Sequence, residues 1–161
     1  MELEPWTGDK APDFTAQCVR CGKFTLSEKV RTSPILLYFY PANYGMACMY
    51  YIQRMNEYHD DIKKLGIQMF HVNPDTAENH EKWMERMDSK YDHIADAGQN
   101  VSRMFGMIVG PSDRGDPLTN RGFVLIDKNM IIRYVWRASM PPETPELGEL
   151  IAKLRNALKG R

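Results

Sequence analysis

The sequence predicts an α/β fold in which a mixed central sheet carries helices on both faces. Strand-like apolar runs alternate with amphipathic helical stretches along most of the chain, which then closes with two further strands and a helix. Alternation of this kind builds parallel strands with crossover helices, and a terminal hairpin adds antiparallel strands. The chain has 161 residues, of which 43% are hydrophobic. That length suits a single domain spanning 1–161 with a sizeable core.

The first expected element is an N-terminal β-hairpin. Its two strands, 13–18 and 23–26, can each extend, and Gly22 lies near the turn between them. The next strand, Ile35–Tyr40, is a continuous apolar and aromatic run, typical of a strand buried on both faces. Pro41 marks its end, because proline has no N–H to continue a sheet ladder.

A long amphipathic helix is expected at 46–65, because its apolar residues recur at every third or fourth position. Gly66 supplies its C-cap, and Cys48 lies in its first turn. The later elements follow from the same patterns and from turn residues. They are a strand at 67–72, a helix at 76–87 with Asp75 and Glu78 as a capping-box-like signal, a strand near 93–95, a helix at 99–105 ended by Gly106, a loop at 108–120, strands at 122–126 and 130–136, and a helix after Pro145.

A thioredoxin-like fold satisfies this order of elements. In an open α/β sheet the functional crevice lies at the carboxyl ends of the strands, where the 41–48 connection is expected. A helix start favours a thiolate at Cys48, and Arg121 supplies a nearby cation if the neighbouring strand ends converge. The alternative is that Cys48 is a buried small hydrophobe and Arg121 an ordinary edge charge.

Three segments together resemble the peroxiredoxins of the alkyl hydroperoxide reductase/thiol-specific antioxidant family, with the bacterioferritin-comigratory subgroup nearest by length. They are Gly8–Phe14, Tyr38–Pro41 with Cys48 following, and Arg121–Asp127. Pro41 and Cys48 match the family motif Pro-x-x-x-Thr-x-x-Cys. The resemblance implies a thiol-dependent peroxidase in which Cys48, Arg121 and Pro41 act on hydrogen peroxide or an organic hydroperoxide. It implies no metal and no other cofactor.

Two positions depart from the family pattern. Gly45 stands at the family's Thr, so the hydroxyl that would position the peroxide is missing. The backbone at Gly45 or the hydroxyl of Tyr44 could take over that positioning. Tyr51 stands where many members have Glu. Two other hypotheses therefore remain: a thioredoxin-like redox or partner-binding domain with weak or lost peroxidase activity, and, ranked lowest, a disulfide oxidoreductase led by the hairpin cysteines.

Cys18 and Cys21 form a Cys-x-x-Cys motif in the hairpin. If Val19 and Arg20 make a two-residue turn, the cysteine Cα atoms lie about 5.5 Å apart, within disulfide reach. Plain thiols, a mutual disulfide, a role in resolving a Cys48 sulfenic acid, and a metal shared between subunits all stay open. The four histidines show no spacing that completes a zinc site with the pair, and His71 is expected to be a satisfied core histidine.

Charge and hydropathy exclude several other classes. Lys plus Arg and Asp plus Glu both number 21, and no basic stripe predicts binding to nucleic acid. No apolar stretch approaches the roughly 20 residues of a membrane helix, and the N-terminus does not resemble a signal peptide. The expectation is a cytoplasmic protein whose partners are a peroxide and a thiol reductant such as a thioredoxin-like protein. A homodimer is also allowed.

Overall fold

The computed structural model describes residues 4–43, 46–111, 117–140 and 143–159. Among them, seven strands form one mixed sheet in the order β2-β1-β5-β4-β3-β8-β9, and β6 pairs with β7 separately. The strands are β1 Thr15–Cys18, β2 Gly22–Thr25, β3 Ile35–Phe39, β4 Gln68–Asn73, β5 Asp92–Ala95, β6 Ile108–Pro111, β7 Pro117–Thr119, β8 Gly122–Ile126 and β9 Ile132–Arg137. The helices are α1 Leu26–Lys29, α2 Met46–Glu57, α3 His59–Lys64, α4 Ala77–Met87, α5 Asn100–Met104 and α6 Leu147–Lys159.

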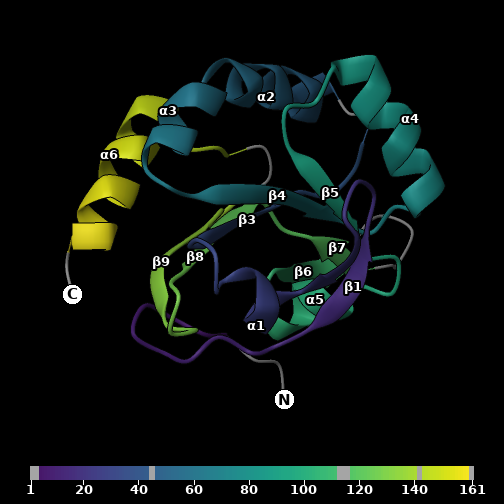
Figure 1. The fold of residues 1–161 in the computed structure, drawn as a ribbon. Coiled ribbons are helices and arrows are strands. Elements are labelled where there is room, and N and C mark those ends of the chain that lie inside the picture. The colour runs from purple at the N-terminus through teal and green to yellow at the C-terminus, as the bar shows by residue number, and fades with distance from the viewer. Residues whose placement is uncertain (1–3, 44–45, 112–116, 141–142, 160–161) are drawn as a thin grey trace.

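The layers confirm the predicted thioredoxin-like architecture. In Figure 1, α2, α3, α4 and α6 cover one face of the sheet, and α1 and α5 lie on the other. Strands β3, β4 and β5 run parallel, whereas β8 pairs antiparallel with β3 and β1 pairs antiparallel with β5. The predicted N-terminal hairpin is present as the antiparallel pair β1 and β2.

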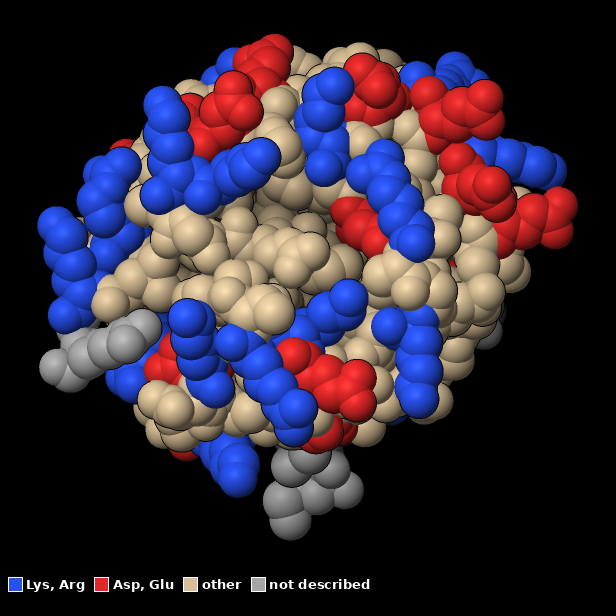
Figure 2. Space-filling model, viewed as in Figure 1, with Lys and Arg blue, Asp and Glu red and all other residues tan. Residues whose placement is uncertain are grey.

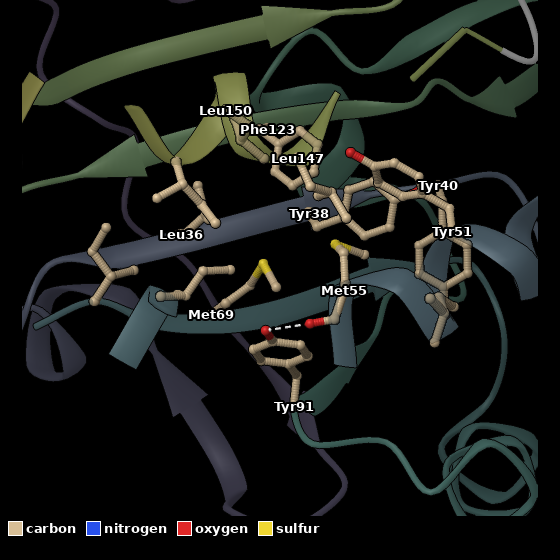
Figure 3. Packing of buried hydrophobic residues seen from close by; sticks show 14 of the residues in the cluster. Leu36, Tyr38, Tyr40, Tyr51, Met55, Met69, Tyr91, Phe123, Leu147 and Leu150 are labelled. Atoms are coloured by element: carbon tan, nitrogen blue, oxygen red, sulfur yellow. Dashed lines mark hydrogen bonds between the residues drawn. The ribbon is translucent and has the colours of Figure 1, made fainter. Parts of the chain in front are cut away.

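Strand β3 lies at the centre of the core and is buried along its whole length, as its unbroken apolar run predicts. Leu36, Tyr38 and Tyr40 face the cluster beneath α2 and α6, while Leu37 and Phe39 face the opposite cluster. Alternation of side chains along a strand produces this division. Figure 3 shows the first cluster, in which the aromatic rings of Tyr38, Tyr40 and Phe123 pack together.

Two predicted elements are wrong in detail. The helix expected at 46–65 is divided at Tyr58, whose N–H bonds to the carbonyl of Met55, three residues back rather than four. This tighter turn ends α2 before α3 begins. The loop expected at 108–120 instead contributes β6 and β7, which pair antiparallel with Ile108 opposite Thr119.

The N-cap of α4 also differs from the expectation. The sequence suggested Asp75 with Glu78, but the capping residue is Thr76, whose Oγ1 accepts a hydrogen bond from the Asn79 N–H at 3.2 Å. Asp75 accepts instead from the Thr76 N–H and the Asn79 side chain. Capping by Thr is as effective as capping by Asp, so the predicted helix still forms.

No helix within the described ranges combines the length and the apolar character needed to cross a membrane.

Close packing at Gly122 gives a first testable prediction. A Cβ there would collide with the side chain of Met107 and lie 2.8 Å from the Trp136 carbonyl oxygen. Gly122→Ala should therefore lower the free energy of unfolding by about 1–3 kcal/mol, as overpacking does. Urea denaturation measures this, with Gly110→Ala as the matched control because a Cβ there meets nothing within 4 Å. Equal stability of the two variants would contradict the packing argument.

Candidate active site

Cys48 is the third residue of α2 and follows the connection that leaves the carboxyl end of β3. Its side chain is only 3% exposed and is a free thiol. Near the first turn of a helix, unpaired N–H groups and the helix dipole favour negative charge on the sulfur. Tyr44 and Gly45, the predicted positioning residues, lie outside the described residues.

Arg121 comes immediately before β8, the strand that pairs with β3. Its Nη2 donates a hydrogen bond to Cys48 Sγ at 3.2 Å, so the two strand ends do converge. The backbone N–H of Arg121 bonds to the Asn120 side chain, and its carbonyl accepts from Ala138, which fixes the position of the residue. Sequence segments 73 residues apart thus meet at one sulfur.

The charge on Arg121 is stable in this setting. Burial alone would lower its pKa, but the phenol of Tyr38 and the sulfur of Cys48 act against burial and hold the pKa above its ordinary value. A guanidinium that stays protonated beside a buried sulfur favours the thiolate over the thiol. The pair therefore has the electrostatics of an activated nucleophile.

Tyr38 is a neighbour of this pair that the sequence reasoning did not single out as a site residue. Burial raises the pKa of its phenol, so the hydroxyl remains neutral. The hydroxyl lies close enough to Arg121 for the two groups to interact, yet neither it nor Arg121 Nη1 makes a well-formed hydrogen bond to a described residue. Two buried donors without acceptors are thus available near the sulfur. The alternation along β3 could have predicted this, because it puts Tyr38 on the same face as Tyr40.

Pro41 and Asn43 lie in the connection between β3 and α2. Both line a cavity of about 230 Å³ together with Ala42, Asn73, Pro74 and Asp75. Asn43 Oδ1 accepts hydrogen bonds from Tyr40 at 2.6 Å and Asn73 at 3.0 Å, and its amide donates to Asp75 at 3.1 Å. These bonds tie the start of the connection to β4 and to the segment before α4.

Three histidines meet in the core behind Tyr40. His80 Nδ1 lies 3.0 Å from His93 Nδ1, so the two rings share one hydrogen, and His93 Nε2 lies 3.2 Å from the Ser89 hydroxyl. His71 stacks on His93 with ring centroids 4.7 Å apart. The expectation that His71 is satisfied is wrong, since neither of its ring nitrogens has a hydrogen-bond partner among the described residues. Burial lowers the pKa of all three histidines, that of His71 to about 3.

The hairpin cysteines lie apart from Cys48. Cys18 and Cys21 are joined as a disulfide with Cα atoms 5.3 Å apart. Cys18 pairs with Gly22, so the turn holds three residues rather than the two expected. Cys18 belongs to the apolar cluster on one face of the sheet and Cys48 to the cluster on the other. Within the described ranges, the group best suited to hold a metal ion is Cys18, Cys21 and Asp92, which does not include Cys48.

The fold and this site define a thioredoxin-like protein with a thiol held by a buried arginine at a strand-to-helix connection. Solved structures agree on the fold. Peroxidoxin BcpB from Mycobacterium tuberculosis superposes with a TM-score of 0.81 at 21% identity, covering 94% of this chain and 97% of that chain. Peroxiredoxin 6 of Arenicola marina superposes with a TM-score of 0.85 at 20% identity, covering 95% and 73%.

Sequence comparison gives the family. Residues 7–135 match the AhpC/TSA family. A peroxiredoxin of Thermoplasma volcanium is 30% identical over 158 residues, covering 94% of this chain and 74% of the relative. The chain therefore belongs to the AhpC/TSA family of peroxiredoxins, as its motifs predict. A chloroplastic 2-Cys peroxiredoxin of Hordeum vulgare is 29% identical over 140 residues, covering 81% of this chain. The chain spans only 51% to 65% of the length of such chloroplastic relatives.

The buried histidines predict a loss of stability in mild acid. The folded protein resists protonation of His71 down to about pH 3, whereas the unfolded chain takes up that proton near pH 6.5. The stabilisation is thus complete above about pH 6.5 and is lost as the pH falls from there toward about 3. His71→Phe should remove about 2 kcal/mol of the decrease in unfolding free energy between pH 7 and pH 5. Urea denaturation at both pH values measures this.

His59→Gln is the control for this experiment, because His59 is one-third exposed. It should leave the decrease between pH 7 and pH 5 largely intact. A decrease that is equally large in the His71→Phe variant would show that His71 does not resist protonation in the folded state.

Proposed function

We propose that this chain is a thiol-dependent peroxidase that reduces hydrogen peroxide or an organic hydroperoxide through a sulfenic acid on Cys48. The observation that supports this most directly is the 3.2 Å contact between Cys48 Sγ and Arg121 Nη2 at the start of α2. Membership of the peroxiredoxin family supports the same chemistry. No cofactor is needed, because the sulfur itself carries both electrons.

The reaction needs one nucleophile and one stabilised leaving group. The Cys48 thiolate attacks one peroxide oxygen, an S–O bond forms and the O–O bond breaks. The sulfur loses two electrons, and the departing oxygen leaves as water or an alcohol after taking up a proton. Arg121 favours the thiolate and then the developing charge on that oxygen, because Nη1 has no other acceptor among the described residues. The Tyr38 hydroxyl is a second donor for the peroxide.

Positioning of the peroxide must differ from the family pattern, since no Thr hydroxyl is present at position 45. We assign it to the donors of Arg121 and Tyr38, helped by the backbone at Gly45 and the Tyr44 hydroxyl. Pro41 borders the site and helps to exclude water from it. Tyr51 is not available, because its hydroxyl donates to the Pro145 carbonyl at 2.9 Å, where it anchors the segment before α6.

Return of the sulfenic acid to the thiol is assigned to an external thiol, such as that of a thioredoxin-like protein, or to a cysteine of a second subunit in a homodimer. Cys18 and Cys21 belong to a cluster on the opposite face of the sheet and are bonded to each other. Neither can reach Cys48 without leaving the hairpin. A cytoplasmic setting, where small and protein thiols are kept reduced, suits this route.

Removal of the nucleophile is the primary test. Cys48→Ser should lower the rate of peroxide consumption by at least about 10³-fold, because the step loses the group that forms the covalent intermediate. Peroxide loss is followed with dithiothreitol as reductant, and dimedone with mass spectrometry should trap a sulfenic acid on Cys48 in the parent. The double variant Cys18→Ser/Cys21→Ser is the control and should retain the parent rate. Parent-level activity in Cys48→Ser would refute the proposal, and an inactive parent would favour a noncatalytic domain.

Arg121 provides a second test at the same site. Arg121→Gln removes the charge and should slow both the reaction with peroxide and alkylation of Cys48 by iodoacetamide. The expected reduction in the peroxide rate is about 10²–10³-fold, the usual effect of losing one donor to a developing oxyanion. Arg121→Lys should recover part of it. The control is Arg103→Gln, which alters an exposed arginine of α5. Unchanged rates in a folded Arg121→Gln variant would make Arg121 a structural residue.

A further inference from the structure

We infer that Cys18 and Cys21 form a second redox site, a dithiol/disulfide couple that exchanges with small disulfides carrying carboxylate groups. The site is independent of the chemistry proposed for Cys48. It lies in the turn between β1 and β2 and opens into a separate cavity.

The turn places a carboxylate against the couple. Asp92 Oδ2 lies 2.7 Å from Cys18 Sγ and accepts from the Cys21 N–H at 3.0 Å, while Oδ1 accepts from the Arg20 N–H at 2.9 Å. Cys18 is 1% exposed, whereas Cys21 is partly exposed. The couple therefore has one outer sulfur that a disulfide can meet and one inner sulfur beside a carboxylate.

This carboxylate favours the reduced form of the couple. A disulfide sulfur has no hydrogen to donate, so Cys18 Sγ and the electron-rich Oδ2 of Asp92 repel each other at that separation. In the dithiol, the same contact becomes a hydrogen bond from the Cys18 thiol to the carboxylate. The two N–H bonds hold Asp92 in place in either state. Each state is thus supported, as a reversible couple requires.

A structural staple is a poor explanation of the pair. The cysteines are separated by only three positions, and the hairpin is already paired at four registers from Thr15 opposite Thr25 to Cys18 opposite Gly22. Cross-links stabilise a protein chiefly by restricting the unfolded chain, and this effect is smallest for short loops. Holding the hairpin together needs no disulfide.

The cavity beside Cys21 indicates which disulfides the site takes. It has a volume of about 580 Å³ and is bordered by Cys21 and Asp92 together with the cationic side chains of Arg20, Lys63 and Lys90. Asp92 is the one carboxylate among these lining residues, and it is engaged by backbone N–H groups. Figure 2 shows a tan hollow near the middle of this face with blue side chains around it. A cavity of this size accepts a small peptide, and its charge attracts carboxylates.

The same charge argues against a resident cation. Cys18, Cys21 and Asp92 offer three ligand atoms within 4.8 Å of one another, so a metal ion is the competing occupant. Three cationic side chains around the opening repel such an ion and attract an anionic disulfide. Exchange is therefore the function that the surroundings favour.

The exchange balances without a further reactant. The Cys21 thiolate attacks one sulfur of the small disulfide, whose S–S bond breaks and releases one small thiol. The Cys18 thiol gives its proton to Asp92 and attacks the Cys21 sulfur, which releases the second small thiol with that proton. The protein couple is oxidised by two electrons and the small disulfide is reduced by two electrons. The reverse sequence reduces the couple.

The test uses the reduced Cys48→Ser protein, in which Cys18 and Cys21 are the remaining thiols. It is mixed separately with oxidised glutathione, neutral hydroxyethyl disulfide and cationic cystamine, and the free thiols are counted by alkylation and mass spectrometry over time. Disulfide formation should be about tenfold faster with oxidised glutathione than with cystamine at low salt, and the difference should shrink as salt is added. Comparable rates with all three disulfides would overturn the proposed selectivity.

Variants and a metal measurement complete the test. Lys63→Glu/Lys90→Glu should remove the preference for oxidised glutathione but keep the rate with hydroxyethyl disulfide, whereas Lys128→Glu, remote from the cavity, should change neither. Asp92→Asn should slow exchange with all three disulfides. Persistence of the native disulfide in millimolar reduced glutathione would show a staple, and one equivalent of tightly held zinc in the reduced protein would show a metal site. Either result would overturn the proposal.

Discussion

The contact between the Arg121 guanidinium and the Cys48 sulfur is the interaction on which the rest of the site depends. Arg121 is only 7% exposed, and a buried cation without a partner is strongly destabilising. The hydrogen bond at 3.2 Å supplies that partner only to the extent that the sulfur carries negative charge. Folding and activation are therefore linked: the packing that buries Arg121 between β3 and β8 also favours the thiolate. The aromatic side chains around the pair lower the local dielectric and strengthen the interaction.

Strand β3 determines where this contact can form. Because β3 is buried on both faces, it must lie in the middle of the sheet, and its carboxyl end is where α2 begins and where β8 begins beside it. The same burial separates the two thiol systems. Cys48 packs with the residues of one face, and Cys18 packs with the residues of the other, so the sheet stands between them. The two sites can then undergo different chemistry in one small chain.

Most of the fold could be predicted from the sequence, because each long element carries its own pattern. The apolar run of β3, the periodicity of α2 and the punctuation at Pro41 and Gly66 act locally, and the structure agrees with them. The break at Tyr58 and the β6–β7 pair depend on contacts made after folding, which no local pattern encodes. At the site, Cys48 and Arg121 were predicted from strand order and family motif. The histidine cluster was missed because His71, His80 and His93 are brought together by three elements that are not adjacent in sequence.

That cluster also bears on how the site handles protons. His80 and His93 are bonded to each other and to Ser89, and burial keeps the pKa of every ring in the cluster low. The printed hydrogen bonds of these rings lead to Tyr40 and Asn43, and none leads to Cys48. A neutral imidazole in this position is a structural group rather than a base. Ionisation of Cys48 must then rest on Arg121 and the helix start, and the proton released when the thiolate forms leaves to solvent. The departing peroxide oxygen must take up its own proton, which is a favourable step because an alkoxide or hydroxide is far more basic than a thiolate.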